Sequence, residues 1–158
     1  MGSDFQRVKV TAVEDAAVIV QITERHPDMD AIHRLLAKAN AEYTPASLAA
    51  PLTKLTIPRS KSGLARNFAA QLLADHGESP FRRAAERDAE DNDRDPDPAR
   101  FIRRVVVREL KPLGKASNAC WLYRATLAIE LKDPELARGF RPGRSYDARA
   151  CPTADWEL

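Results

Sequence analysis

The sequence predicts an α+β fold, with an antiparallel sheet of about five strands and two main helices packed on one face. Three observations lead to this prediction. Segments that alternate apolar and polar residues occur near both ends of the chain. Two segments between them repeat apolar residues at helical spacing. The chain has 158 residues, 44% of them hydrophobic, so we expect residues 1–158 to form a single domain with its own core.

The first two strands are expected to form a hairpin. Residues 5–13 and 17–23 both alternate apolar and polar side chains. Glu14 and Asp15 lie between them and are expected at the turn. The apolar residues expected on the inner face are Val8, Val10, Ala12, Val18, Val20 and Ile22.

Two helices are expected next. The first spans residues 28–44, with Asp28 as its N-cap, and Pro45 ends it because the residue before proline avoids the α region. The second runs from about Ser62 to His76, with Gly77 as the residue that follows its end. The apolar stripe of this second helix is Leu64, Phe68 and Leu72.

Weaker signals lie around these helices. Residues 46–50 suggest one helical turn, and residues 52–57 suggest a short strand. Pro80 begins a short third helix. From about residue 86 to 98 the chain carries seven acidic residues against two arginines, with few apolar side chains to bury. We therefore expect a mobile acidic loop over residues 86–98, becoming irregular at Asp88.

The second half of the chain is rich in predicted strands. Residues 101–110 and 121–131 are expected to pair, with residues 111–118 as their connection. Within 121–131, alternate residues ending in Leu127, Ile129 and Leu131 should face the core. The remaining expected elements are a helical turn at 135–138, a turn at Pro142-Gly143 and a last strand at 145–151.

Basic residues are the strongest indication of a binding surface. Residues 46–74 contain four cations and no acid, and residues 103–115 and 138–149 are also basic. The segment Arg59-Ser60-Lys61-Ser62 leads into the second helix, where free N–H groups and cations would bind an anion. The alternative is a capped helix with ordinary surface charge. The candidate anion- or partner-binding residues are Arg59, Ser60, Lys61, Ser62, Arg66, Arg103, Arg104 and Arg108.

Residue patterns for catalysis are sparse. His26, His33 and His76 have no metal-ligand spacing, and the sequence lacks a Gly-rich nucleotide loop, so we expect no metal and no cofactor. Cys120 and Cys151 are expected to be free thiols without an adjacent base. These observations favour a protein that is not an enzyme.

The expected function is a non-enzymatic binding module for a protein partner, in the manner of small accessory, inhibitor or immunity-type proteins of bacteria or phages. The alternative is a nucleic-acid-binding accessory protein that uses the basic segments. The N-terminus lacks the apolar core of a secretory signal, and no apolar run is long enough to span a membrane. We therefore expect a cytoplasmic protein that does not bind membranes.

Overall fold

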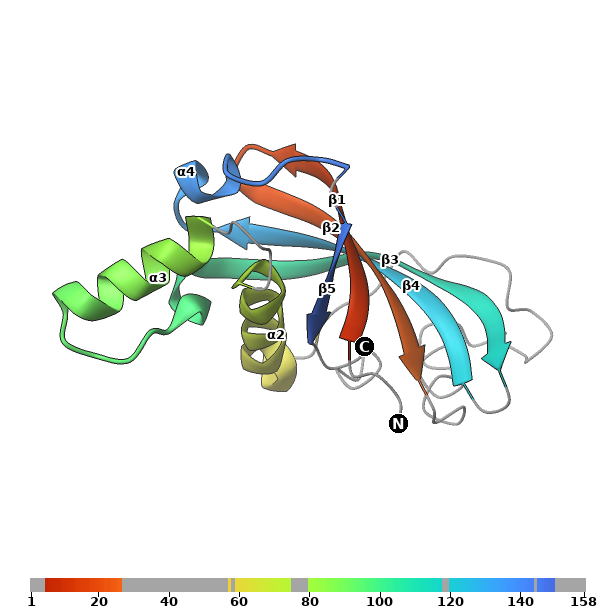
Figure 1. Cartoon of the computed structure of the whole chain (residues 1–158). Coiled ribbons are helices and arrows are strands. Elements are labelled where there is room, and N and C mark those ends of the chain that lie inside the picture. Colours follow the sequence, from red (N-terminus) through yellow and green to blue (C-terminus); the bar gives the residue numbers. More distant parts are fainter. Residues whose placement is uncertain are drawn as a thin grey trace.

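The computed structural model describes residues 5–26, 57, 59–74, 80–117, 120–143 and 145–149. Its five strands form one antiparallel sheet in the order β3-β4-β2-β1-β5, with β3 and β5 at the edges (Figure 1). This arrangement confirms the predicted α+β class and the antiparallel sheet. The strands are β1 (Phe5–Glu14), β2 (Ala17–His26), β3 (Ile102–Ser117), β4 (Cys120–Leu131) and β5 (Ser145–Arg149).

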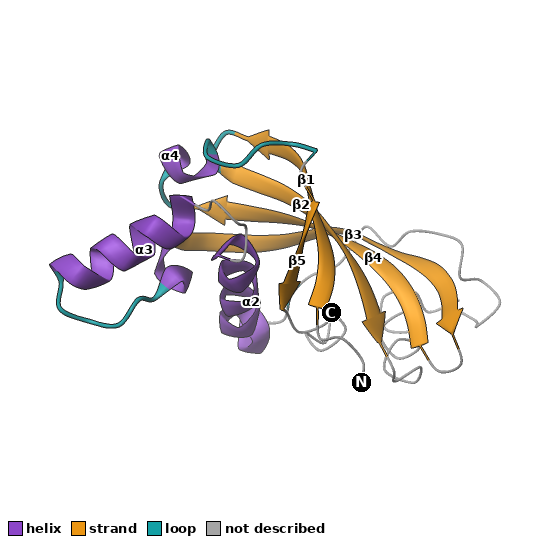
Figure 2. Ribbon diagram, viewed as in Figure 1, coloured by secondary structure: helices purple, strands orange, loops and turns teal. Residues whose placement is uncertain are grey.

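Helix α2 lies beside the sheet (Figure 2). Its Leu72 carbonyl accepts a hydrogen bond of 2.8 Å from the hydroxyl of Tyr146 on β5. The first predicted helix, at 28–44, lies outside the described residues, as do 46–50 and 52–56, so the packing of two helices on one face stays a prediction. The described helical elements are η1 (Arg59–Lys61), α2 (Ser62–Ala74), α3 (Pro80–Asp91), η2 (Pro98–Phe101) and α4 (Pro134–Ala137).

The main core lies on the face of the sheet that α2 covers. Alternate residues of the central strands β2 and β4 point into it, as the period of a strand requires. Among the described residues, the opposite face carries a smaller apolar cluster, centred on Ala17, Ile19 and Ala128. Within the part of the chain that the structure describes, the largest fully buried side chains are Ile22, Leu72, Leu73, Phe81, Ile102, Leu110, Leu127, Ile129 and Leu131.

A β-bulge in β1 changes one predicted facing. The pairing of β1 with β2 shifts register between Val10 and Ala12, so one residue is inserted there. Val13 therefore packs against the main core, while Ala12 packs against the small cluster on the other face. The prediction that Ala12 shares a face with Val8 and Val10 is wrong, because uniform alternation does not continue across a bulge.

Strand β3 is longer than predicted. Residues 111–117, which we expected to connect two strands, continue β3 and pair with β4. Pro112 pairs with Tyr123 of β4, and proline occurs in sheets mainly on edge strands, which is the position of β3 in the described sheet. The pairing also shifts register between Pro112 and Gly114, so a bulge accommodates the two residues that suggested a loop.

The acidic segment is helical over its first part. Helix α3 continues to Asp91, so the prediction that the chain becomes irregular at Asp88 is wrong. Ala85 and Ala89, one helical turn apart, are buried and hold this last part of the helix against the protein. The carboxylate of Asp88 also accepts hydrogen bonds from Arg94, at 2.6 Å, and Arg100, at 3.0 Å.

Mobility of the rest of this segment stays a prediction. Residues 92–97 form turns and irregular chain with exposed side chains. Within the described part of the chain, we expect trypsin to cut first after Arg94, before Arg87, which lies inside α3. Mass spectrometry of a short digestion would identify the first fragments. First cleavage at Arg87 would mean that the end of α3 unfolds more readily than the turn.

Candidate partner-binding site

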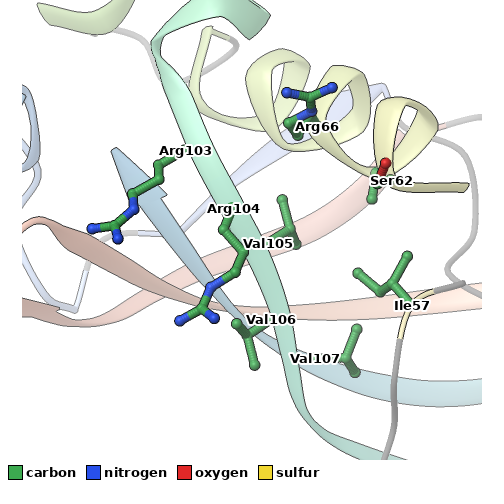
Figure 3. A pocket seen from close by; sticks show the side chains of 9 residues that line it. Ile57, Ser62, Arg66, Arg103, Arg104, Val105, Val106 and Val107 are labelled. Atoms are coloured by element: carbon green, nitrogen blue, oxygen red, sulfur yellow. The ribbon is translucent and has the colours of Figure 1, made fainter. Parts of the chain in front are cut away.

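A hollow opens beside the edge strand β3, between it and the start of α2 (Figure 3). Its volume is about 470 Å³. We call it the β3–α2 hollow. Five of its lining residues belong to β3 and three to α2, and the polar ones among them are Arg103 and Arg104 of β3 and Ser62 and Arg66 of α2. The other described lining residues are the apolar Ile57, Ala65, Val105, Val106 and Val107.

The hollow brings together residues from two basic segments that lie far apart in the sequence. Ser62 and Arg66 come from the segment without acids, and Arg103 and Arg104 come from the second basic segment. All four were predicted as binding residues. The other four predicted residues are not part of the described lining: Arg59, Ser60 and Lys61 form η1, and Arg108 lies further along β3.

The shape of β3 explains how these side chains are placed. Register shifts occur between Ile102 and Arg104 and between Val107 and Glu109, so the intervening stretch is bracketed by bulges. Val105 and Val107 belong to the main core, whereas Val106 packs on the opposite face. Figure 3 shows Val105 and Val107 on the Ile57 side of β3, and Arg104 and Val106 on the other side. The sequence did not predict which face of the sheet each residue of this strand occupies, because bulges interrupt its alternation.

The arginines on β3 differ in their ionic partners. The Nε atom of Arg104 donates to Glu130 at 2.6 Å, although the Arg104 side chain is 67% exposed. Arg108 makes a bidentate contact with Glu14, at 2.8 and 3.2 Å. Within the described residues, Arg66 and Arg103 are exposed and have no ion pair. These two guanidinium groups are therefore available to an acidic ligand at the hollow.

The serine-rich turn does not form the helix N-terminus that the anion hypothesis assumed. The Ser62 hydroxyl donates to the carbonyl oxygen of Arg59 at 2.9 Å, which ties it back to η1. A 3₁₀ turn also precedes α2, and such a turn uses N–H groups in its own hydrogen bonds. Ser62 therefore lines the hollow with a hydroxyl that already donates its hydrogen bond to η1.

Sequence reasoning missed the apolar part of the site. Ile57 and Ala65 line the hollow together with Val105, Val106 and Val107. The three valines were expected in a strand, but nothing in the sequence showed that this strand would lie at an edge. Edge position depends on the order of strands in the sheet, which is a long-range property of the fold.

The ion pair of Arg108 with Glu14 gives a pH prediction. The hydrogen bond from Arg108 holds the pKa of Glu14 below its ordinary value of 4.5, and the charge of Arg108 acts in the same direction. A lowered folded-state pKa favours the folded state above the unfolded pKa, and this contribution is lost as the pH falls through the folded pKa. Arg108→Ala should therefore raise the pKa of Glu14 towards 4.5 in an NMR titration of its side-chain carbons. An unchanged pKa would show that the ion pair does not persist in solution.

The chemical character of the hollow suits binding. Its described lining holds one hydroxyl and three guanidinium groups, and no carboxylate, imidazole or thiol. Among the described residues, no group of three or more His, Cys, Asp or Glu side chains is arranged to hold a metal ion. In the same part of the chain, no helix combines the length and apolar character needed to cross a membrane.

Comparison with protein-family models, with curated proteins and with solved structures found no match to this chain.

Proposed function

We propose that this protein is a non-enzymatic binding module that recognises an acidic segment of a protein partner at the β3–α2 hollow. The observation that carries the proposal is that one hollow is lined both by apolar side chains and by Arg66 of α2 and Arg103 of β3, which have no ion pair among the described residues. A cationic rim next to apolar side chains matches a segment that carries both carboxylates and apolar groups. As in the sequence-based expectation, we place it among cytoplasmic accessory, inhibitor or immunity-type proteins of bacteria or phages.

Charge pairing favours a protein partner over a nucleic acid. Proteins bind nucleic-acid backbones through several cations that replace counterions on phosphates. Along β3 and β4, however, Arg104, Arg108 and Arg124 each pair with a glutamate. Every aromatic side chain whose burial is described is buried or half-buried, so this part of the chain offers no exposed ring for base stacking.

The absence of general acids, bases and thiols from the described lining supports binding over catalysis. Ser62 is the one hydroxyl there, and its hydrogen bond goes to a backbone carbonyl. Activation of a serine needs an adjacent base, such as an imidazole, within hydrogen-bond reach.

The proposal is tested by selection from a random peptide library. The wild-type protein should enrich peptides that contain acidic and apolar residues, and the Arg66→Glu/Arg103→Glu variant should not retain them. For an enriched peptide, calorimetry should show affinity at least about tenfold weaker for the variant, or about 1.4 kcal/mol. Arg83→Glu/Arg87→Glu is the matched control, because it makes the same charge change on exposed positions of α3.

Two outcomes would contradict the proposal. One is enrichment of peptides that bind the Arg66→Glu/Arg103→Glu variant as well as the wild type. The other is tight binding of a short DNA duplex or RNA strand at physiological salt, with an affinity that falls steeply as salt rises. The second result would favour the nucleic-acid-binding alternative.

A further inference from the structure

We propose that the acidic partner segment binds as an extended strand along the β3–α2 hollow, added to the outer edge of β3, where the sheet of the described residues ends. This inference rests on the proposed function and specifies the conformation of the bound segment. In this mode, backbone hydrogen bonds supply affinity, and the pockets for alternate side chains supply specificity.

The edge of β3 provides the backbone groups. Strand β3 pairs with β4 on one side and is the last strand of the described sheet on the other (Figure 1). In an antiparallel edge strand, every second residue directs its N–H and C=O groups away from the sheet. The hollow lies along Arg103–Val107, which is the stretch whose outward backbone groups would pair.

The side chains on the two sides of β3 indicate the sequence of the bound segment. On the α2 side, Ile57 and Ala65 lie beside the inward Val105 and Val107, and Arg66 also lines the hollow from α2, so this side suits mainly apolar residues. On the other side, the Arg104 side chain lies next to Val106 (Figure 3), and Arg103 also lines the hollow. Because side chains of a strand alternate between faces, the matching segment alternates acidic and apolar residues.

The same charges argue against a second copy of this chain as the occupant. Arg103 and Arg104 precede the three valines of β3, and Arg108 follows them. An antiparallel pair of β3 edges centred on these valines would place arginines of one copy opposite arginines of the other. Like charges placed opposite each other destabilise strand pairing. An acidic segment meets no such repulsion and can pair with Arg103, which has no ion pair among the described residues.

The test uses a synthetic peptide of about eight residues, close to a usual strand length, that alternates glutamate and valine. Two N-methylated peptides are compared with this parent. In each, every second backbone amide is methylated, so that the methyl groups lie along one edge of the extended peptide in the first form and along the other edge in the second. Only one edge can face β3, so one form should bind at least about tenfold more weakly than the parent, while the other should keep its affinity. Amides within residues 104–107 should also exchange more slowly with solvent when the parent peptide is bound.

The possible outcomes separate this inference from the proposed function. Equal binding of both N-methylated forms, with unchanged exchange along β3, would overturn strand addition. If the wild-type protein binds these peptides and the Arg66→Glu/Arg103→Glu variant does not, the proposed function stands. If the peptide binds equally to that variant, or does not bind the wild type, both proposals are overturned. Slow exchange along β3 that grows with protein concentration in the absence of peptide would instead indicate pairing between two copies.

Discussion

Leu127→Ala should lower the free energy of unfolding by about 2–5 kcal/mol, because it removes a large apolar side chain from the core. Leu127 is fully buried on the central strand β4, as is Ile129, for which we expect a loss of the same size. Thr126→Ala and Lys132→Ala should change the free energy of unfolding by no more than about 0.5 kcal/mol. Urea denaturation followed by circular dichroism measures all four variants.

This comparison tests the facing of β4 directly. Thr126 lies on the opposite face of the strand from Leu127, and Lys132 is exposed just after the strand ends. Equal losses for the two sets would mean that the buried face is assigned wrongly. Since β4 pairs with both β2 and β3, such a result would also change which side chains of β3 are assigned to the hollow.

Phe81→Ala should cost about 3–5 kcal/mol, in the range for a large aromatic residue truncated in a core. Phe81 is fully buried, and its ring meets that of Phe101 edge to face, with the ring centroids 6.0 Å apart. It is the main apolar anchor of α3, whose remaining residues are small or charged. Denaturation gives the loss, and Arg83→Ala, on the exposed side of the same helix, should be nearly neutral.

A small loss for Phe81→Ala would have a structural meaning. It would show that α3 contributes little to the cooperative fold and separates from the rest of the protein before global unfolding. Hydrogen exchange of the α3 amides would then be fast in the wild type as well. Slow exchange in α3 with a small loss of stability would instead indicate that the cavity is refilled by its neighbours.

The local elements could be predicted from the sequence wherever the periodic pattern was long and uninterrupted. The hairpin of β1 and β2, the facing of Leu127 and Ile129, and the helix that begins at Ser62 follow from alternation or helical spacing. The predictions of strand facing and strand length were wrong where a β-bulge inserts one residue and interrupts the alternation. The bulge before Ala12 moved it to the other face, and a bulge at Pro112 let β3 continue through an expected loop.

The sequence predicted some residues of the site but not their arrangement, which depends on contacts between distant segments. Charge in the sequence identified Arg66, Arg103 and Arg104 as candidates, but it could not show that the two segments meet or that Arg104 pairs with Glu130. Both facts depend on the strand order, which places β3 at the edge next to β4. The helix 28–44, expected from a clear apolar repeat, lies outside the described residues.

The most direct test of the central claim is NMR chemical-shift mapping of the alternating glutamate–valine peptide on the wild-type protein. We predict that the largest shifts fall on Ser62, Ala65 and Arg66 and on the stretch Arg103–Val107, and that they disappear in Arg66→Glu/Arg103→Glu. Largest shifts at Glu14, Ala17 and Ala128, on the opposite face of the sheet, with no shifts at Ser62, Ala65 and Arg66 would contradict the assignment of the β3–α2 hollow as the binding site.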